Sequence, residues 1–163
     1  MNPVLTSSQL AAIKTHIDAD GVLAVIPNTT DGADAIAQAF NAVRAPDYWV
    51  WRTVVGKHEY TRQISQDGTS FSWSTYIARS QGERDGWREM FNGRENVDPS
   101  QLNVRQGFAD IFSGAGGAAQ RTHMLAASRR LASIVEWVLR TNTAVGSVAA
   151  PDNMGSEGPV TYQ

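Results

Sequence analysis

A glycine-rich stretch, SGAGGA at residues 113–118, is the part of the sequence closest to a known chemical motif. Gly114, Gly116 and Ala119 fit the G-x-G-x-x-G/A pattern, in which glycines let the backbone approach the pyrophosphate of a dinucleotide. That function also requires a strand directly before the first glycine, whereas the preceding residues have the apolar spacing of a helix. We therefore predict that the stretch binds no cofactor and forms a hinge between two helices, with Gly114, Gly116 and Gly117 at the turn.

Side chains that commonly perform catalysis form no recognisable constellation. The chain has no cysteine, which removes thiolate nucleophiles and sulfur-rich zinc sites, and no serine lies in a G-x-S-x-G elbow. His16, His58 and His123 lie in different predicted elements, and none has a second histidine at the spacing of a metal-binding pair. Carboxylates such as Glu83 and Asp85 alternate with arginines, as on exposed helix faces. We predict no enzymatic activity, no metal site and no small-molecule substrate.

Charge and hydropathy limit the classes of partner. The formal net charge of −2 lacks the basic excess that drives non-specific binding to nucleic acid. No apolar run approaches the roughly 20 residues that cross a bilayer, and the N-terminus does not read as a secretion signal. We expect an aqueous compartment without membrane contact, and the absence of cysteine agrees with a reducing cytoplasm.

Charged faces of two predicted helices are candidates for contact with a partner or a neighbouring subunit. Opposite charges alternate in one helix, and the last helix carries mainly basic residues against the single Glu136. The basic face could touch DNA phosphates, but the negative net charge favours a protein partner. The candidate contact residues are Arg84, Asp85, Arg88, Arg121, Arg129 and Arg130.

Apolar periodicity, caps and breakers predict a mainly α fold. We expect a bundle of about four to five helices, with one short extended segment and an extended C-terminal tail that has room for a small β-hairpin. The tryptophans Trp73 and Trp87 lie on the apolar stripe of the predicted helix over residues 70–92, which favours a core or subunit interface. We predict helices over residues 7–20, 70–92, 98–113 and 118–140, and one that is capped by Thr30 or Asp31 and ends before Pro46. Residues 57–65 could add a further short helix, and VLAVI fits a helical turn better than a buried extended piece. YWVWRTVV is expected to be extended.

Domain organisation follows from the change in composition near Thr143. We predict a helical domain over residues 1–143 and an extended arm over residues 144–163, because the arm is rich in Gly, Pro, Ser, Thr and Asn and lacks helical periodicity. An extended arm of this kind suits docking on a partner. The side chains expected to anchor this arm are Met154, Val160 and Tyr162. On this interpretation, deleting the arm leaves a folded helical domain.

Three stretches together resemble small proteins encoded in the structural gene clusters of tailed bacteriophages. They are YWVWRT, ARSQGERDGWREMFNGRENVDPSQLNVRQGFADIFSGAGGAAQ, and PDNMGSEGPVTY. The resemblance covers most of the chain from about Tyr48 onward, and its layout is most similar to that of head–tail connector, or adaptor, proteins.

That resemblance implies a ring subunit of the virion neck. Such a ring has about twelve copies, is assembled in the host cytoplasm, binds beneath the portal protein, and contacts other neck and tail proteins while DNA at most passes through it. The extended YWVWRTVV is a departure, because a purely helical adaptor does not need it. The alternatives are a tail terminator or capsid-stabilising protein, or a small enzyme or DNA-binding factor directed at the host.

Overall fold

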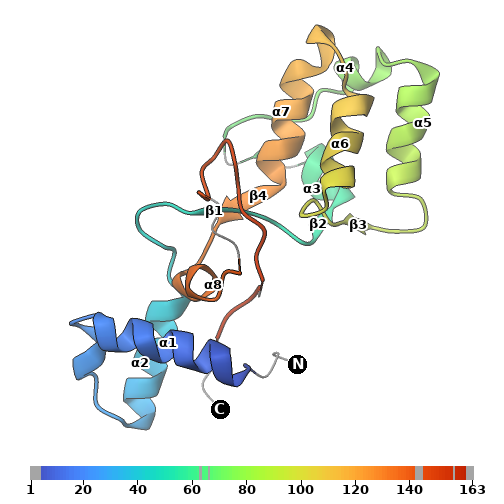
Figure 1. Cartoon of the computed structure of the whole chain (residues 1–163). Helices are drawn as coiled ribbons and strands as arrows, with labels where there is room; N and C mark the ends of the chain where they lie inside the picture. Colours follow the sequence, from blue (N-terminus) through green and yellow to red (C-terminus); the bar gives the residue numbers. More distant parts are fainter. Residues whose placement is uncertain (1–4, 63, 66, 142–144, 156, 161–163) are drawn as a thin grey trace. The chain divides into compact units, whose positions relative to one another are not determined.

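The computed structural model describes residues 5–62, 64–65, 67–141, 145–155 and 157–160. The fold is mainly helical, as the sequence predicts. The chain divides into two compact units: unit 1 contains Met1–Val50 and Leu131–Gln163, and unit 2 contains Trp51–Arg130 (Figure 1). This division differs from the predicted helical domain over residues 1–143 with a separate tail.

Short elements build both units. The helices of the described residues are α1 (Ser7–Ala19), α2 (Thr30–Asn41), α3 (Lys57–Arg62), α4 (Trp73–Ile77), α5 (Gln81–Met90), α6 (Leu102–Ile111), α7 (Ala118–Ala127) and α8 (Ile134–Val138), with single turns η1 (Leu23–Val25) and η2 (Ala115–Gly117). The strands are β1 (Trp49–Trp51), β2 (Val55–Gly56), β3 (Asn96–Val97) and β4 (Arg129–Leu131). β1 pairs with β4, and β2 pairs antiparallel with β3. The predictions of a turn in VLAVI, an extended YWVWRTVV and a short helix after it are confirmed.

The helices of unit 1 begin at side-chain caps. The Gln9 amide N–H donates to the Thr6 hydroxyl at 3.3 Å, and the Gln9 side chain accepts from the Thr6 N–H at 2.8 Å, which completes the capping box predicted for α1. α2 begins earlier than predicted, because Thr29 is its cap and accepts from the Gly32 N–H at 3.1 Å. These helices pack with α8 around the buried side chains Leu23, Phe40, Val135 and Leu139.

Aromatic rings fill the core of unit 2. Trp87 is 2% exposed, and its ring centroid lies 4.9 Å from that of Phe91 and 5.9 Å from that of Phe112, in edge-to-face geometry. Helices α5, α6 and α7 lie side by side around this core (Figure 1). The remaining members of the core are Val55, Tyr60, Val97, Phe108, Ile111 and Met124.

The predicted single helix over residues 70–92 is wrong, because the structure divides it into α4 and α5. The break occurs at Ser80, whose hydroxyl accepts from the Glu83 N–H at 3.3 Å while the Glu83 carboxylate accepts from the Ser80 N–H at 2.8 Å. This capping box starts a new helix. It overrides the apolar stripe that suggested one continuous element.

The predicted long last helix over residues 118–140 is also wrong. α7 ends at Ala127, residues Arg129–Leu131 form β4, and α8 starts after Ser133. Ser133 and Glu136 form another capping box, with the Ser133 N–H donating to the Glu136 carboxylate at 2.9 Å.

The predicted helix start at Asp98-Pro99 lies too early, since α6 begins at Leu102. The Asp98 carboxylate accepts from the Ser100 N–H at 3.0 Å and from the Ser100 hydroxyl at 2.6 Å, so it closes a local turn before the helix.

Candidate functional site: an arginine network at the glycine turn

The glycine stretch connects α6 to α7. Gly114 has φ +68°, a conformation that favours glycine, and Ala118 begins α7. A Cβ atom on Gly117 would lie 2.1 Å from the carbonyl oxygen of Phe112, so the chain turns too tightly here for any side chain. The element before Gly114 is a helix, and the dinucleotide pattern therefore lacks the strand that it requires.

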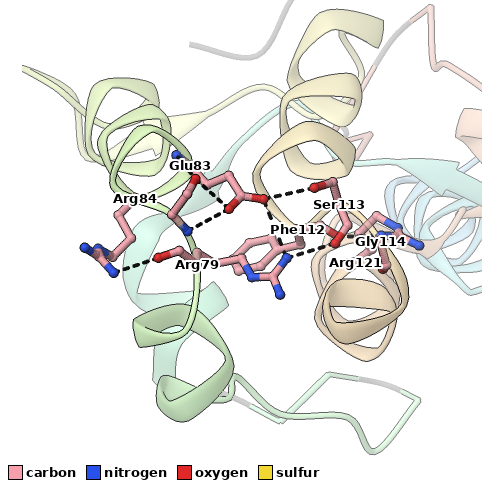
Figure 2. Close-up of polar contacts among 8 residues, drawn as sticks. Arg79, Glu83, Arg84, Phe112, Ser113, Gly114 and Arg121 are labelled. Carbon is pink, nitrogen blue, oxygen red and sulfur yellow. Dashed lines mark hydrogen bonds and ion pairs between the residues drawn. The ribbon is translucent and has the colours of Figure 1, made fainter.

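Two arginines bind the backbone where α6 ends (Figure 2). The Arg79 guanidinium donates to the Ser113 carbonyl at 2.8 Å. The Arg121 guanidinium donates to the carbonyls of Phe112 and Gly114, the latter at 3.1 Å. Because Phe112 is the C-cap residue of α6, Arg121 satisfies a carbonyl at the helix end, and both arginines fix the backbone of the glycine turn that follows.

A third arginine repeats this arrangement at the end of α4. Arg84 donates to the carbonyl of Ile77 at 2.8 Å and to that of Arg79 at 2.7 Å. Glu83 links the turn between α4 and α5 to the turn between α6 and α7. Its carboxylate accepts from the Ser113 hydroxyl at 2.9 Å and lies 3.6 Å from a guanidinium nitrogen of Arg79 (Figure 2). The network therefore joins the start of α5 to the turn between α6 and α7.

The sequence-predicted contact residues are not all equally available for a partner. Arg84 and Arg121 are half-buried in the network, whereas Asp85 and Arg88 form an exposed ion pair of 2.9 Å on α5. Arg129 pairs with Asp67. Sequence reasoning missed Arg79 and Ser113 altogether, because their roles depend on the contact between two turns that lie far apart in the sequence.

The Glu83 carboxylate makes the stability of this network depend on pH. Hydrogen bonds from the Ser80 hydroxyl and N–H and from the Ser113 hydroxyl lower its pKa below the ordinary value of 4.5. A lowered pKa in the folded chain means that the stabilisation is complete above pH 4.5 and is lost as the pH falls through the folded pKa.

We expect Glu83→Gln to reduce the acid sensitivity of unit 2. The urea midpoint of the wild type should fall between about pH 7 and about pH 3.5 by more than that of Glu83→Gln, because the variant has no carboxylate to protonate there. Glu89→Gln, on the same helix, is the control and should follow the wild type. Equal pH dependence in all three chains would contradict this role.

A cleft of about 310 Å³ with a mixed polar and apolar lining lies elsewhere in unit 2. Its lining residues are Arg52, Glu59, Ile64, Ser65, Ala126, Ala127, Arg129 and Arg130. Arg52 forms an ion pair of 2.7 Å with Glu59. Although partial burial acts against ionisation, hydrogen bonds from Arg52 and the Gly56 N–H lower the pKa of Glu59. Carboxylates of this unit therefore already neutralise Arg52 and Arg129.

One of the histidines, His123, takes part in buried hydrogen bonds. His123 is fully buried, with Nε2 2.8 Å from the Tyr60 carbonyl and Nδ1 3.1 Å from the Thr69 hydroxyl. Because a carbonyl only accepts, we assign the proton to Nε2. Among the residues that the structure describes, no group of three or more His, Asp or Glu side chains could hold a metal ion.

The C-terminal segment packs on unit 1. The Tyr48 hydroxyl donates to the buried Asp152 carboxylate at 2.8 Å, and Met154 packs against the cluster of Tyr48, Val50 and Ala132. Val160 packs against the core between α1, α2 and α8. Two of the predicted arm anchors thus contact their own chain, and the third, Tyr162, lies outside the described residues. The arm therefore adds partly buried side chains to the clusters of unit 1, and the folding of residues 1–143 without the arm stays a prediction.

Tyr48→Phe should destabilise unit 1 by about 1–3 kcal/mol, because it leaves the buried Asp152 carboxylate without this donor. Burial and the bond to Asp152 raise the pKa of Tyr48 from 10.0 to about 12. A raised pKa means that stability falls as the pH rises from about 10 to about 12, and the variant should lack this loss. Thermal unfolding at neutral and alkaline pH measures both effects, with Tyr76→Phe in unit 2 as the control.

No protein-family model, curated protein or solved structure matches the chain. In the described part of the chain, no helix has the length and apolar character needed to cross a membrane.

Proposed function

We propose that this chain is a structural subunit of a tailed-bacteriophage particle, and that it forms the head–tail connector ring between the portal protein and the tail. The resemblance of the sequence to phage structural proteins supports this assignment. In this role the chain needs no cofactor or substrate, and it contacts neighbouring copies, the portal protein and other neck and tail proteins.

The observation that carries the proposal is an exposed apolar pair on α4. Trp73 is 55% exposed and Ile77 is 66% exposed. Residues four positions apart lie next to each other on a helix, so these side chains form one apolar surface. Tryptophan in such a position is typical of protein–protein contacts, which gain most of their free energy from a few large side chains.

The polar part of unit 2 fits a protein partner better than DNA. Arg121 binds backbone carbonyls and Arg129 pairs with Asp67, so two of the basic residues of the predicted last helix already have acceptors within the chain. The exposed Asp85–Arg88 pair on α5 offers charges of both signs, which suits a protein surface.

One structural feature favours the second candidate, a tail terminator or capsid-stabilising protein. The segment YWVWRTVV forms β1 and the start of β2, and a purely helical adaptor would not need these strands. Both candidates are virion components, and the position in the particle distinguishes them.

Incorporation into particles tests the proposal. We expect Trp73→Gln combined with Ile77→Gln to reduce the number of copies per purified particle at least tenfold, a change that corresponds to about 1.4 kcal/mol. Leu102→Gln is the matched control, because Leu102 is 60% exposed and lies at the start of α6. Mass spectrometry of washed particles measures the copies, and circular dichroism verifies folding. Undiminished incorporation of the double variant would contradict the role of this surface.

A further inference from the structure

The described end of the C-terminal arm, residues 157–160, binds through its backbone to a site in unit 1. We call this site, which contains Asn41 and Glu136, the seat of the arm. The Asn41 side-chain amide donates to the Val160 carbonyl at 2.8 Å, and its carbonyl oxygen accepts from the Val160 N–H at 2.8 Å. The Glu136 carboxylate accepts from the Gly158 N–H at 3.2 Å. Asn41 therefore pairs with the arm in the way that a neighbouring strand would.

One apolar side chain completes the seat. Val160 is half-buried against the core cluster that α1, α2 and α8 form. Glu136 is only 4% exposed, and its other carboxylate oxygen accepts from the Ser133 N–H at 2.9 Å, which fixes its position at the start of α8. The seat of Asn41, Glu136 and this cluster thus accepts an extended segment with one apolar residue.

The arm is attached near the seat by a firmer anchor. Asp152 is buried, bonds to Tyr48 and bridges Val50 of β1, while Met154 packs beside them. By contrast, the bonds between Asn41 and Val160 are exposed to solvent and the Val160 side chain is only half-buried, so the arm leaves the seat more easily than Asp152 leaves its anchor. Val160 lies eight positions after Asp152, and an extended chain of eight residue steps spans at most about 29 Å.

We propose that, in the oligomer, the arm of one copy occupies the Asn41–Glu136 seat of a neighbouring copy. The occupant is the same segment that fills the seat within one chain, so the exchange gains and loses identical contacts and links the copies of a ring. The neighbouring seat must lie within the reach of the arm from its Asp152 anchor. This inference rests on the proposed function, because it requires a homo-oligomer.

Disulfide trapping tests the exchange, since the chain contains no cysteine of its own. One tagged chain carries Asn41→Cys and an untagged chain carries Val160→Cys. After the two chains assemble together and are oxidised, we expect an interchain disulfide at least fivefold above a control that pairs Val160→Cys with Ala35→Cys, an exposed position of the same helix. A chain with both Asn41→Cys and Val160→Cys reports whether the arm occupies its own seat.

The outcomes separate the two proposals. Interchain disulfides at the control level contradict arm exchange, whether the doubly substituted chain closes an intrachain disulfide or forms none. Sedimentation of the wild-type chain is measured first. A wild type that stays monomeric and is missing from particles contradicts the connector role as well, whereas an oligomer with only intrachain disulfides contradicts arm exchange alone.

Discussion

Gly117→Ala should destabilise unit 2 by about 3–5 kcal/mol. The added Cβ atom would lie 2.1 Å from the carbonyl oxygen of Phe112, 2.5 Å from its carbonyl carbon and 2.9 Å from its Cα. All three are backbone atoms, so no rotation of a side chain can relieve the contact. The turn would have to open, and the carbonyls that bind Arg121 would move with it.

Urea unfolding and hydrogen exchange of residues 51–130 measure this effect. Gly82→Ala is the control, because a Cβ on Gly82 meets nothing within 4 Å and alanine favours the helix by up to about 1 kcal/mol. A Gly117→Ala chain as stable as the wild type would show that the turn tolerates a side chain.

Trp87→Ala should cost unit 2 about 3–5 kcal/mol, because it removes the ring that the other aromatic side chains surround. Beyond the loss of buried apolar area, the variant loses edge-to-face contacts with Tyr60, Phe91 and Phe112. The same methods measure the loss.

Trp73→Ala provides the contrast to this core substitution. Trp73 is 55% exposed, and its removal should change stability by less than about 1 kcal/mol while it affects assembly. Equal losses of stability in Trp87→Ala and Trp73→Ala would contradict the assignment of Trp87 to the core and of Trp73 to a contact surface.

The sequence predicted α1 and the turn between α6 and α7 because the signals are local. Thr6 with Gln9 is a capping box, and a run of small residues after an apolar helix indicates a reversal of the chain. The same local signal was present but overlooked at Ser80 with Glu83 and at Ser133 with Glu136. Recognising these boxes would have divided both helices that were predicted too long.

Other features could not be predicted from local pattern. Arg79 binds the carbonyl of Ser113, which lies 34 residues further along the chain, and the sequence does not record that contact. The partner of Asn41 lies 119 residues away in the arm. The composition of the C-terminal segment predicted no helix, and its described residues contain none, but the composition could not show that Asp152 and Val160 pack on the same chain.

The position and copy number of the chain in an intact particle test the central claim most directly. Electron cryomicroscopy of the neck, combined with labelling of a tagged chain, gives both quantities. We predict a closed ring of about twelve copies between the portal and the tail. Absence from washed particles, or a location away from the head–tail junction, would contradict the connector assignment.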